Sequence, residues 1–352
     1  MPLLARTVTT PIAIEVRAGA VDGLGPLLAD GRISTGGRVA VAVGPGQGDE
    51  IARSITRTAP SSSVVPIASG SLNGALELIT HLRAGWYDAV VGIGGGKTLD
   101  AAKYAASMTG LPFVAVATNL SNDGLASPVA SLESHGRKGS FGVHIPIAVF
   151  VDIDYVRDAP ARQTRSGVGD VISNLSAIAD WQLAGRITGE PIDGLAVALA
   201  SSATNALVRR DDSVADDTFL STLAESLILS GIAMTVARTS RPCSGACHEI
   251  SHALDASHDS PGLHGEQVGL GALFATWLRG DDDLVGLIDA CLRHHDLPRV
   301  PEDLGLSAEQ FCEAVLEAPE TRPDRFTILE HLAMDKQQVK ERVDAFITAF
   351  GR

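Results

Sequence analysis

The sequence predicts an α/β domain with a mostly parallel sheet, followed by an all-α domain. Between residues 11 and 152, short runs rich in Val, Ala and Ile alternate with stretches of helical periodicity. This alternation is typical of a parallel sheet covered by helices. After Ala159-Pro160 the strand-like runs stop and helical patterns follow to the end. A chain of 352 residues is long for one core, so we expect domains over 1–158 and 159–352.

The first domain is expected to contain six strands. They are the apolar runs at 11–16, 38–43, 64–67, 88–93, 112–117 and 145–152. Several are continuous and rich in Val, as in strands buried on both faces. Helices are expected between them, at 21–28, 49–58, 73–84 and 98–108. The helix 73–84 carries Leu76, Ile79 and Leu82 on one predicted face.

The second domain reads as helices almost throughout. The first is expected over 165–185, with an apolar stripe of Val171, Leu175 and Ile178. Asp170 would lie in its first turn and Asn174 one turn later on the same face. Further helices are expected at 191–209, 214–237, 245–255, 265–279, 283–294, 307–317 and 335–349.

Composition excludes several function classes. The formal net charge is −14, which would repel a nucleic acid backbone. Four cysteines in a chain this long do not form a disulfide framework, so a reducing compartment is expected. The first residues carry no apolar segment typical of a secretory signal, and no apolar run is expected to approach the length of a membrane span. We therefore expect a soluble, cytoplasmic protein.

The segment Gly94-Gly95-Gly96-Lys97-Thr98 connects an expected strand to an expected helix. Glycines let the backbone approach a phosphate closely, and the helix N-terminus offers N–H groups and a favourable dipole. The pattern is neither G-x-G-x-x-G nor a P-loop, so it indicates a nucleotide site only moderately. The alternative is a tight turn that binds nothing. The polar loop 118–128 also follows a strand end, where α/β proteins bind their ligands.

Three histidines form the second candidate site. His248 and His252 are four residues apart, which places both on one face of a helix, and His264 follows shortly downstream. Catalytic zinc takes three protein ligands and leaves one position open. Asp170, His248 and His264 would meet that number, with His252 beside the metal or the substrate. The alternative is a group of hydrogen-bonded core histidines.

Other candidates are weaker. Cys243 and Cys247 flank the same stretch, but a pair on apolar ground is more often packing than a ligand set. The acidic run 281–283 is predicted to begin a solvated helix. Three histidines lack a well-placed carboxylate and are interpreted as surface residues: His258, His294 and His295.

Several segments together carry a resemblance that covers nearly the whole chain. They are 94–103, 118–128, 167–174 with Asp180-Trp181, 240–245 with His248, 251–255 and 264–267. In these residues the chain resembles the sn-glycerol-1-phosphate dehydrogenases. That family lies in the larger group of iron-containing alcohol dehydrogenases, glycerol dehydrogenases and dehydroquinate synthases. The resemblance implies a dehydroquinate synthase-like fold, with an NAD(P)-binding domain, a helical metal-binding domain and the active site in the cleft between them.

The resemblance also implies roles for individual residues. Asp123 and Ser127 would lie towards nicotinamide and substrate. Cofactor binding would fall to Gly94, Gly95, Gly96, Lys97, Asp100, Thr118, Ser121 and Ser127. The implied ligands of Zn²⁺, or of Fe²⁺ or Ni²⁺ in its place, are Asp170, His248 and His264.

The implied reaction is the reversible reduction of dihydroxyacetone phosphate to sn-glycerol 1-phosphate, a step of phospholipid biosynthesis. The metal would act as a Lewis acid on the carbonyl, and His252 or a metal-bound water would relay the proton. The substrate phosphate needs a cation that the sequence does not identify. A small-molecule substrate and a homo-oligomer are the expected partners.

Three departures from the family pattern bear on specificity. Gly44-Pro45-Gly46 stands where an acidic residue usually takes the ribose hydroxyls, which leaves room for the 2′-phosphate of NADP. Ala246-Cys247 before His248, and Asn122, differ near the substrate. The alternatives are a dehydrogenase for another small polyol or ketone phosphate, and a dehydroquinate synthase-type cyclase, whose cluster of Lys and Arg we do not find. The intact Asp/His/His set disfavours a non-catalytic descendant.

Overall fold

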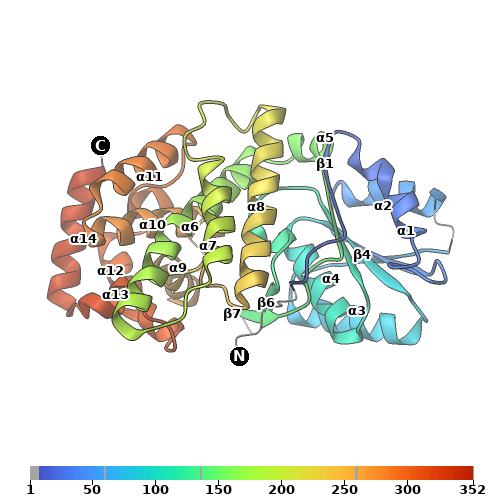
Figure 1. The fold of residues 1–352 in the computed structure, drawn as a ribbon, viewed down its shortest axis with the longest axis horizontal. Coiled ribbons are helices and arrows are strands. Elements are labelled where there is room, and N and C mark those ends of the chain that lie inside the picture. The colour runs from blue at the N-terminus through green and yellow to red at the C-terminus, as the bar shows by residue number, and fades with distance from the viewer. Residues whose placement is uncertain (1–7, 59–60, 135–136, 258–260, 352) are drawn as a thin grey trace. The chain divides into compact units, whose positions relative to one another are not determined.

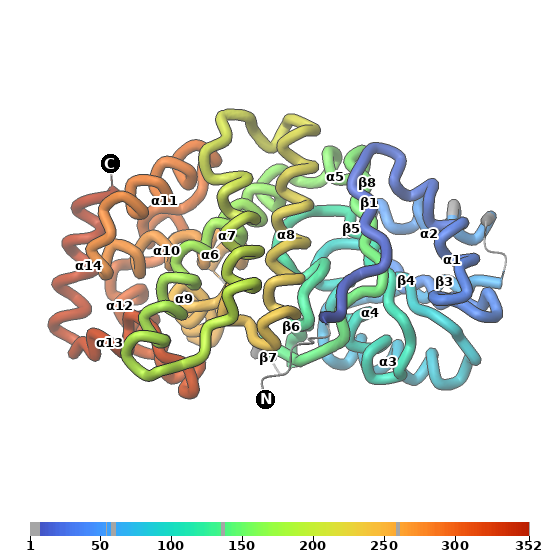
Figure 2. The backbone as a smooth tube through the Cα atoms, viewed as in Figure 1, coloured from blue at the N-terminus to red at the C-terminus, as the bar shows by residue number. Residues whose placement is uncertain are grey.

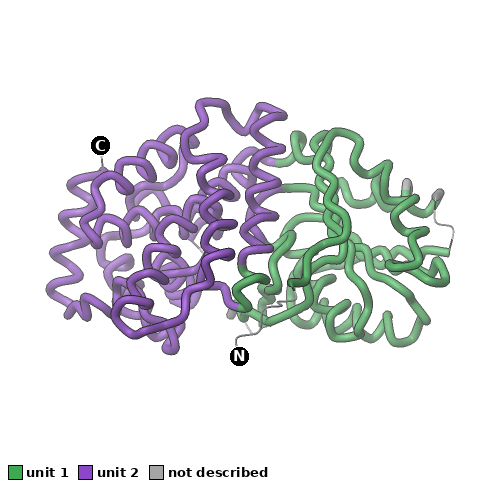
Figure 3. The backbone as a smooth tube through the Cα atoms, in the orientation of Figure 1, with its two compact units in different colours: residues 1–119, 124–159, 234–238 green, residues 120–123, 160–233, 239–352 purple. Residues whose placement is uncertain are grey.

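The computed structural model describes residues 8–58, 61–134, 137–257 and 261–351 (Figure 1). The chain divides into two compact units, coloured green and purple in Figure 3. Unit 1 consists of residues 1–119, 124–159 and 234–238. Unit 2 consists of residues 120–123, 160–233 and 239–352. Two short segments thus belong to a different unit from the residues on either side of them: 120–123 and 234–238.

Unit 1 is built on a six-stranded sheet in which every pairing is parallel. The strands follow the order β1-β8-β5-β4-β2-β3. Their bounds are Ala13–Arg17 (β1), Val39–Val43 (β2), Ser63–Pro66 (β3), Ala89–Gly94 (β4), Phe113–Ala117 (β5) and Ala148–Asp152 (β8). The mostly parallel sheet that the alternating pattern predicted is confirmed. The four strands that are buried at every residue are β2, β4, β5 and β8.

Helices connect the strands of this sheet. Their bounds are Leu24–Leu28 (α1, after the 3₁₀ turn η1 at Ala20–Gly23), Gly48–Thr58 (α2), Leu72–Ala84 (α3), Gly96–Thr109 (α4) and Ile153–Arg157 (α5). The predicted face of α3 is partly wrong, because Leu76 is 46% exposed. The buried face instead runs through Ala75, Leu78, Ile79 and Leu82, which share one side at helical spacing.

The sequence patterns miss the short helix α5 and also the antiparallel hairpin of β6 (Val129–Ser134) and β7 (Arg137–Gly142). Only one face of β6 is buried, through Ala130 and Leu132. Two apolar residues in alternation are too few to separate a strand from a polar loop. The hairpin matters for the site because β6 packs on α4, the helix that follows the glycine turn.

Unit 2 is helical, as predicted. Its helices are α6 (Ala161–Thr188), α7 (Gly194–Asn205), α8 (Asp217–Ala237), α9 (Ala246–Ser257), α10 (His264–Arg279), α11 (Asp282–His294), α12 (Ala308–Thr321), α13 (Ile328–Leu332) and α14 (Lys336–Phe350), with a 3₁₀ turn, η3, at Pro301–Leu304. The backbone tube in Figure 2 follows them in chain order. Helix α10 packs on α6 and α9, and α9 packs on α12. Helix α6 begins earlier than predicted, so Asp170 lies in its third turn and not in its first.

Two glycines let α6 and α10 approach each other closely. A Cβ on Gly169 would lie 2.1 Å from the carbonyl oxygen of Gly265, and a Cβ on Gly265 would lie 1.7 Å from that of Ser166. No side chain fits at such distances, so the glycines bring two backbones together. This contact sets Asp170 of α6 beside His264, the first residue of α10.

Helix α8 corrects one expectation from the sequence. Among the described residues it is the one helix long and apolar enough to cross a membrane by length and composition. However, 67% of its apolar window is buried inside the protein, as in the core helix of a folded domain. Its apolar face includes Phe219, Leu223 and Leu227, all fully buried.

Candidate functional site

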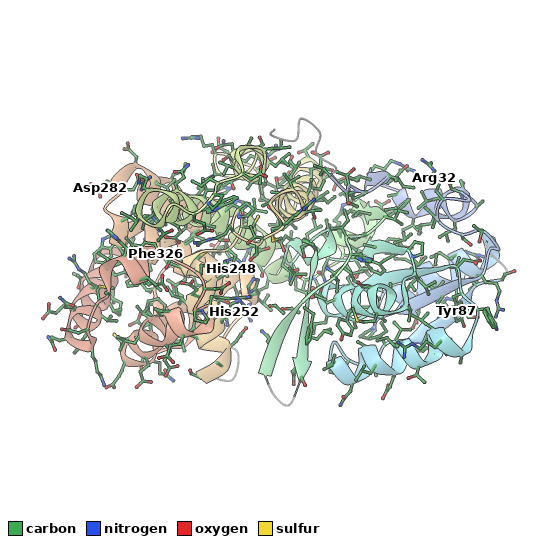
Figure 4. All side chains as sticks on the ribbon, turned by 60° about the horizontal axis from the view of Figure 1, so that its bottom comes forward. Arg32, Tyr87, His248, His252, Asp282 and Phe326 are labelled. Carbon is green, nitrogen blue, oxygen red and sulfur yellow. The ribbon has the colours of Figure 1, made fainter. Side chains whose placement is uncertain are left out.

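Three potential metal ligands come together in unit 2. Asp170 on α6, His248 on α9 and His264 on α10 each offer one ligand atom, and these atoms lie within 4.8 Å of one another. The Oδ1 atom of Asp170 lies 3.6 Å from Nε2 of His264 and 4.0 Å from Nε2 of His248. Figure 4 shows His248 and His252 on the same helix. The structure thus brings together the three residues that the sequence analysis selected.

The charges of this cluster suit a divalent cation. Burial, followed by the nearby charge of Asp123, raises the pKa of Asp170. Burial, followed by the neighbouring His264 and His252, lowers the pKa of His248. Burial thus disfavours the charged forms of both side chains, and a divalent cation between them would favour the ionised carboxylate of Asp170 beside a neutral imidazole. Ligand atoms around tetrahedral Zn²⁺ are roughly 3.4 Å apart, close to the distances found here.

Neighbouring groups orient both imidazoles. The Oγ atom of Ser251 lies 3.4 Å from Nδ1 of His264 and donates to Oε1 of Gln267 at 2.6 Å. The Sγ atom of Cys247 lies 3.3 Å from Nδ1 of His248. In each ring the second nitrogen has a partner, which turns Nε2 towards Asp170. Burial raises the pKa of the Cys247 thiol to about 12 and also raises that of Cys243, so both remain thiols, as expected for packing residues.

The N-terminus of α9 is fixed by a buried carboxylate. Asp180 is 0% exposed and accepts hydrogen bonds from the backbone N–H groups of Ala246 (2.8 Å) and Ile328 (2.9 Å). Arg279 donates to its Oδ1 atom at 2.7 Å. Because Ala246 begins the helix that carries His248, this network positions the cluster. Asp180 belongs to one of the segments that carry the family resemblance, but its sequence position alone indicates no role.

His252 lies one turn beyond His248 and contacts an arginine that the sequence analysis missed. The Nη2 atom of Arg322 is 3.3 Å from Nε2 of His252. Burial and then the charge of Arg322 lower the pKa of His252 to about 3. The ring is therefore neutral at physiological pH and accepts from the guanidinium. No sequence pattern singled out Arg322, because one arginine after a helix end has no characteristic spacing.

The glycine turn lies in unit 1, where β4 meets α4. Gly94 ends the strand, Gly95 caps the helix and Gly96 begins it. A Cβ on Gly95 would lie 2.3 Å from Nδ2 of Asn119, so any side chain here would have to displace Asn119. The first N–H groups of a helix have no intrahelical acceptor, which makes this terminus suitable for a phosphate. Lys97 in the same turn is exposed.

Two predicted cofactor residues are buried beneath this turn. The Oδ1 atom of Asp100 lies 3.2 Å from Nζ of the fully buried Lys103, and its Oδ2 atom accepts from the N–H of Ser131 at 3.2 Å. Lys103 also donates to the carbonyl oxygens of Gly124 (2.6 Å) and Ser127 (3.1 Å). The Ser127 hydroxyl donates to a backbone carbonyl. These side chains tie α4 to the loop that follows β5.

The remaining predicted residues lie along this loop, half-buried. The N–H of Thr118 donates to the carbonyl of Gly94 at 3.1 Å, within unit 1. Ser121 and Asp123 belong to unit 2. There the carbonyl of Ser121 accepts from Ser166, and the N–H of Asp123 donates to Oδ2 of Asp170 at 2.8 Å. Asp123 therefore touches the proposed ligand through its backbone.

The interpretation of three histidines as surface residues is partly wrong. His294 is exposed, but His295 is only 3% exposed and packs against Phe219 at a ring distance of 4.9 Å. Burial and then His294 lower the pKa of His295 to about 4. His258 lies outside the described residues. The predicted helix start at 281–283 is confirmed, since Asp281 caps α11 by accepting from the N–H of Leu284.

The departure at Gly44 has a steric cause. This glycine follows β2, and a Cβ there would lie 2.1 Å from Oγ1 of Thr98, in the first turn of α4. An acidic side chain at this position would have to displace Thr98. The absence of the expected carboxylate here therefore fits the close packing of this turn on α4.

Comparisons with known proteins identify the family. Residues 15–160 match the model of the iron-containing alcohol dehydrogenases. The chain is 38% identical to the glycerol-1-phosphate dehydrogenase [NAD(P)+] of Archaeoglobus fulgidus over 283 residues, which are 77% of this chain and 79% of that protein. It is 36% identical to the enzyme of the same name from Hyperthermus butylicus over 327 residues, 91% of this chain and 92% of the other.

Solved structures share the fold. A probable glycerol dehydrogenase from Sinorhizobium meliloti is 22% identical, with a TM-score of 0.79 over 98% of this chain and 99% of that one. Maleylacetate reductase from Rhizobium sp. is 18% identical, with a TM-score of 0.75 over 97% and 98%. The predicted fold class is thus confirmed. On these similarities the chain belongs to the glycerol-1-phosphate dehydrogenases, NAD(P)-dependent enzymes within the iron-containing alcohol dehydrogenase family.

Proposed function

We propose that the protein reversibly reduces dihydroxyacetone phosphate to sn-glycerol 1-phosphate with NADH or NADPH. One observation carries the proposal: the Asp170, His248 and His264 cluster occurs in a chain 38% identical to a named glycerol-1-phosphate dehydrogenase. The family supplies the activity class, and the cluster supplies a site at which a carbonyl oxygen can be polarised.

We propose Asp170, His248 and His264 as the ligands of Zn²⁺, with Fe²⁺ or Ni²⁺ as alternatives. One carboxylate and two imidazoles form a donor set common in catalytic zinc sites, which leave a further position open. When bound, the metal supplies Lewis acidity towards the substrate carbonyl. The neighbours Ser251 and Cys247 hold the ring orientations that this role requires.

For the cofactor, we propose that the turn Gly94–Gly96 donates backbone N–H groups to the pyrophosphate. The dipole of α4 favours that negative charge. NAD(P)H supplies the hydride when bound. Lys97 is exposed and can add a positive charge, while Thr118 and Ser121 lie on the half-buried loop. Asp100 and Ser127 support the turn from beneath.

The proposal includes both nicotinamide cofactors. The lack of space for an acidic residue at Gly44 removes the group that would repel a 2′-phosphate. Turnover with NADH and NADPH at comparable kcat/KM is therefore expected, and a preference above about 100-fold, or about 2.7 kcal/mol, would contradict this part.

Reduction adds a hydride to the carbonyl carbon and a proton to its oxygen. We propose that His252, as a neutral imidazole one turn from His248 on the same helix face, relays this proton from a water molecule and does not supply it as an imidazolium. Asp123 is proposed to act near the nicotinamide and the substrate, since its backbone already contacts Asp170.

The proposal is tested with purified protein, Zn²⁺, dihydroxyacetone phosphate and either cofactor, by following the absorbance of the reduced nicotinamide. Turnover that a chelator abolishes is expected, with sn-glycerol 1-phosphate as the product. His264→Ala should lower kcat/KM at least about 100-fold and reduce the bound metal. His294→Ala is the matched control, because His294 is exposed and outside the cluster.

Failure to oxidise NAD(P)H with dihydroxyacetone phosphate, while metal is bound, would contradict the proposed substrate. A panel of other small ketone phosphates then tests the alternative raised by Asn122 and Ala246-Cys247. A homo-oligomer and a cytoplasmic location are further expectations, which light scattering and cell fractionation can test.

A further inference from the structure

Gln267 is buried behind His264, one of the proposed metal ligands in unit 2. It belongs to α10, which His264 begins, and it is 1% exposed. The fully buried Ser251 of α9 contacts both side chains. Its Oγ atom lies 2.6 Å from Oε1 of Gln267 and 3.4 Å from Nδ1 of His264. A continuous row of polar groups thus leads away from the ring of the ligand.

The side-chain amide of Gln267 can face only one way in this row. Its Nε2 atom lies 3.2 Å from Oδ1 of Asp255 and 3.2 Å from the carbonyl oxygen of Pro261. A carboxylate and a backbone carbonyl accept hydrogen bonds and donate none. A flipped amide would set its own oxygen against both acceptors, so the surrounding groups assign the NH₂ to this side. The Oε1 atom therefore faces Ser251 as an acceptor.

This orientation decides the direction of the next two hydrogen bonds. A serine hydroxyl has one hydrogen, and Ser251 donates it to Oε1 of Gln267. Towards His264 the hydroxyl then offers only a lone pair, so Nδ1 has to carry the hydrogen of the neutral ring. The Nε2 atom keeps its lone pair, and it lies 3.6 Å from Oδ1 of Asp170. A metal ion binds a neutral imidazole through that lone pair.

We infer that Gln267 is a positioning residue, which acts through Ser251 to hold His264 in the tautomer that binds metal at Nε2. The inference rests on the proposed metal site and goes beyond it, because Gln267 is not itself a ligand. Without Oε1 as an acceptor, the hydroxyl of Ser251 is free to turn its hydrogen towards Nδ1 of His264. The hydrogen of the ring would then lie on Nε2, where it blocks the metal.

The test measures the Zn²⁺ affinity of Gln267→Met, of Ser251→Ala and of the double variant, by competition with a chelator. Gln267→Met should bind Zn²⁺ roughly 10- to 100-fold more weakly than the wild type, because a thioether is a weak acceptor and releases the Ser251 hydroxyl. Ser251→Ala removes that hydroxyl, so the double variant should bind Zn²⁺ more tightly than Gln267→Met alone. Gln182→Met is the matched control, since Gln182 is exposed on α6.

A role of Gln267 in packing alone predicts a different result. Two independent losses would add, and the double variant would then bind Zn²⁺ more weakly than either single variant. That outcome, in variants whose melting curves show that they are folded, would overturn the inference. Wild-type affinity in folded Gln267→Met would overturn it as well.

A second readout needs neither a variant of Gln267 nor bound metal. In the metal-free wild type labelled with ¹⁵N-histidine, at a pH where the ring of His264 is neutral, the ¹⁵N shifts report which ring nitrogen carries the hydrogen. The signals of His264 are assigned by their loss in His264→Ala. Hydrogen on Nδ1 is expected. Hydrogen on Nε2 would contradict the inference even if Gln267→Met does not fold.

The outcomes separate this inference from the proposed function. If the wild type binds Zn²⁺ but does not reduce dihydroxyacetone phosphate, the proposed reaction fails, while the Zn²⁺ affinities still decide the role of Gln267. If the wild type reduces dihydroxyacetone phosphate and the losses of Zn²⁺ affinity simply add, the inference about Gln267 alone is overturned.

Discussion

The two units of this enzyme build their candidate sites in opposite ways. In unit 1 the proposed cofactor cradle is made by backbone, at a turn where a Cβ on Gly95 would meet the side chain of Asn119. In unit 2 the metal cluster is made by side chains from three helices, α6, α9 and α10. The first site depends on the lack of a Cβ at Gly95. The second depends on the ligand atoms of three side chains. Substitutions should therefore damage the two sites differently. Adding a side chain should harm the cradle, and removing a side chain should harm the cluster.

Both units bury charged side chains, and in unit 1 the buried Asp100 pairs with Lys103. Unit 2 buries Asp170 and Asp180 almost completely, and Arg279 pairs with Asp180. Burial raises the pKa of both carboxyls. Buried charges cost several kcal/mol each unless they are paired or bind a metal. These buried networks hold side chains of unit 2 in place. Removing one member of a network should therefore strongly destabilise the protein.

The largest expected effect is loss of the Asp180 network. Asp180→Ala removes the acceptor for two backbone N–H groups and leaves Arg279 buried without its carboxylate. The free energy of unfolding should fall by about 3–5 kcal/mol, and metal affinity by roughly 10- to 100-fold, because α9 loses its anchor. Urea unfolding and metal titration measure the two effects. Unchanged metal affinity in the folded variant would show that Asp180 does not position His248.

A smaller effect is expected from pH, through His295 in unit 2. Its pKa falls from an ordinary value near 6.5 to about 4 on folding, so between these values the unfolded chain binds the proton and the folded protein does not. Stability is therefore full above about pH 6.5 and is lost as pH falls towards 4, by up to about 3 kcal/mol.

His295→Gln should flatten this part of the stability–pH curve, and His144→Gln, at an exposed position in unit 1, should not. Equilibrium unfolding at several pH values provides the measurement. Parallel curves for the wild type and His295→Gln would rule out this contribution.

The smallest effect is expected in the cradle of unit 1. In Gly95→Ala the new methyl would meet Nδ2 of Asn119 at 2.3 Å, and Asn119 can shift because it is a side chain. We expect the KM for NAD(P)H to rise on the order of 10-fold with metal content unchanged, since the turn can no longer approach the pyrophosphate as closely.

Combining Gly95→Ala with Asn119→Gly removes the clash and should restore part of the cofactor affinity. Gly286→Ala is the control, because a Cβ at Gly286 meets no atom within 4 Å. Loss of metal in Gly95→Ala would show that metal binding at the cluster depends on the cofactor turn.

The sequence predicts the elements of unit 1 well wherever a local pattern of residues is enough to identify a strand or a turn. The strands β2, β4, β5 and β8 are continuous apolar runs, and the glycine turn marks the start of α4. Prediction fails where few apolar residues carry the pattern. The hairpin of β6 and β7 is missed, and so are the first residues of α6, Ala-Arg-Gln-Thr, which show no helical periodicity.

For the site, the spacing of His248, His252 and His264 indicates a cluster, and the ligand number of catalytic zinc with an aspartate on an expected helix adds Asp170. What spacing cannot show is which distant side chains converge through packing. Asp180 acts through the start of α9, and Arg322 reaches His252 only because α12 packs on α9. Contacts of this kind arise between segments far apart in the chain, so no local pattern reveals them.

The most direct test of the central claim is anomalous diffraction at the zinc absorption edge, from crystals of the zinc-loaded protein. The account predicts one peak within coordination distance of Asp170 Oδ1, His248 Nε2 and His264 Nε2, and no peak there in Asp170→Ala. An empty cluster in the wild-type crystal, or a peak at Cys243 and Cys247 in its place, would contradict it.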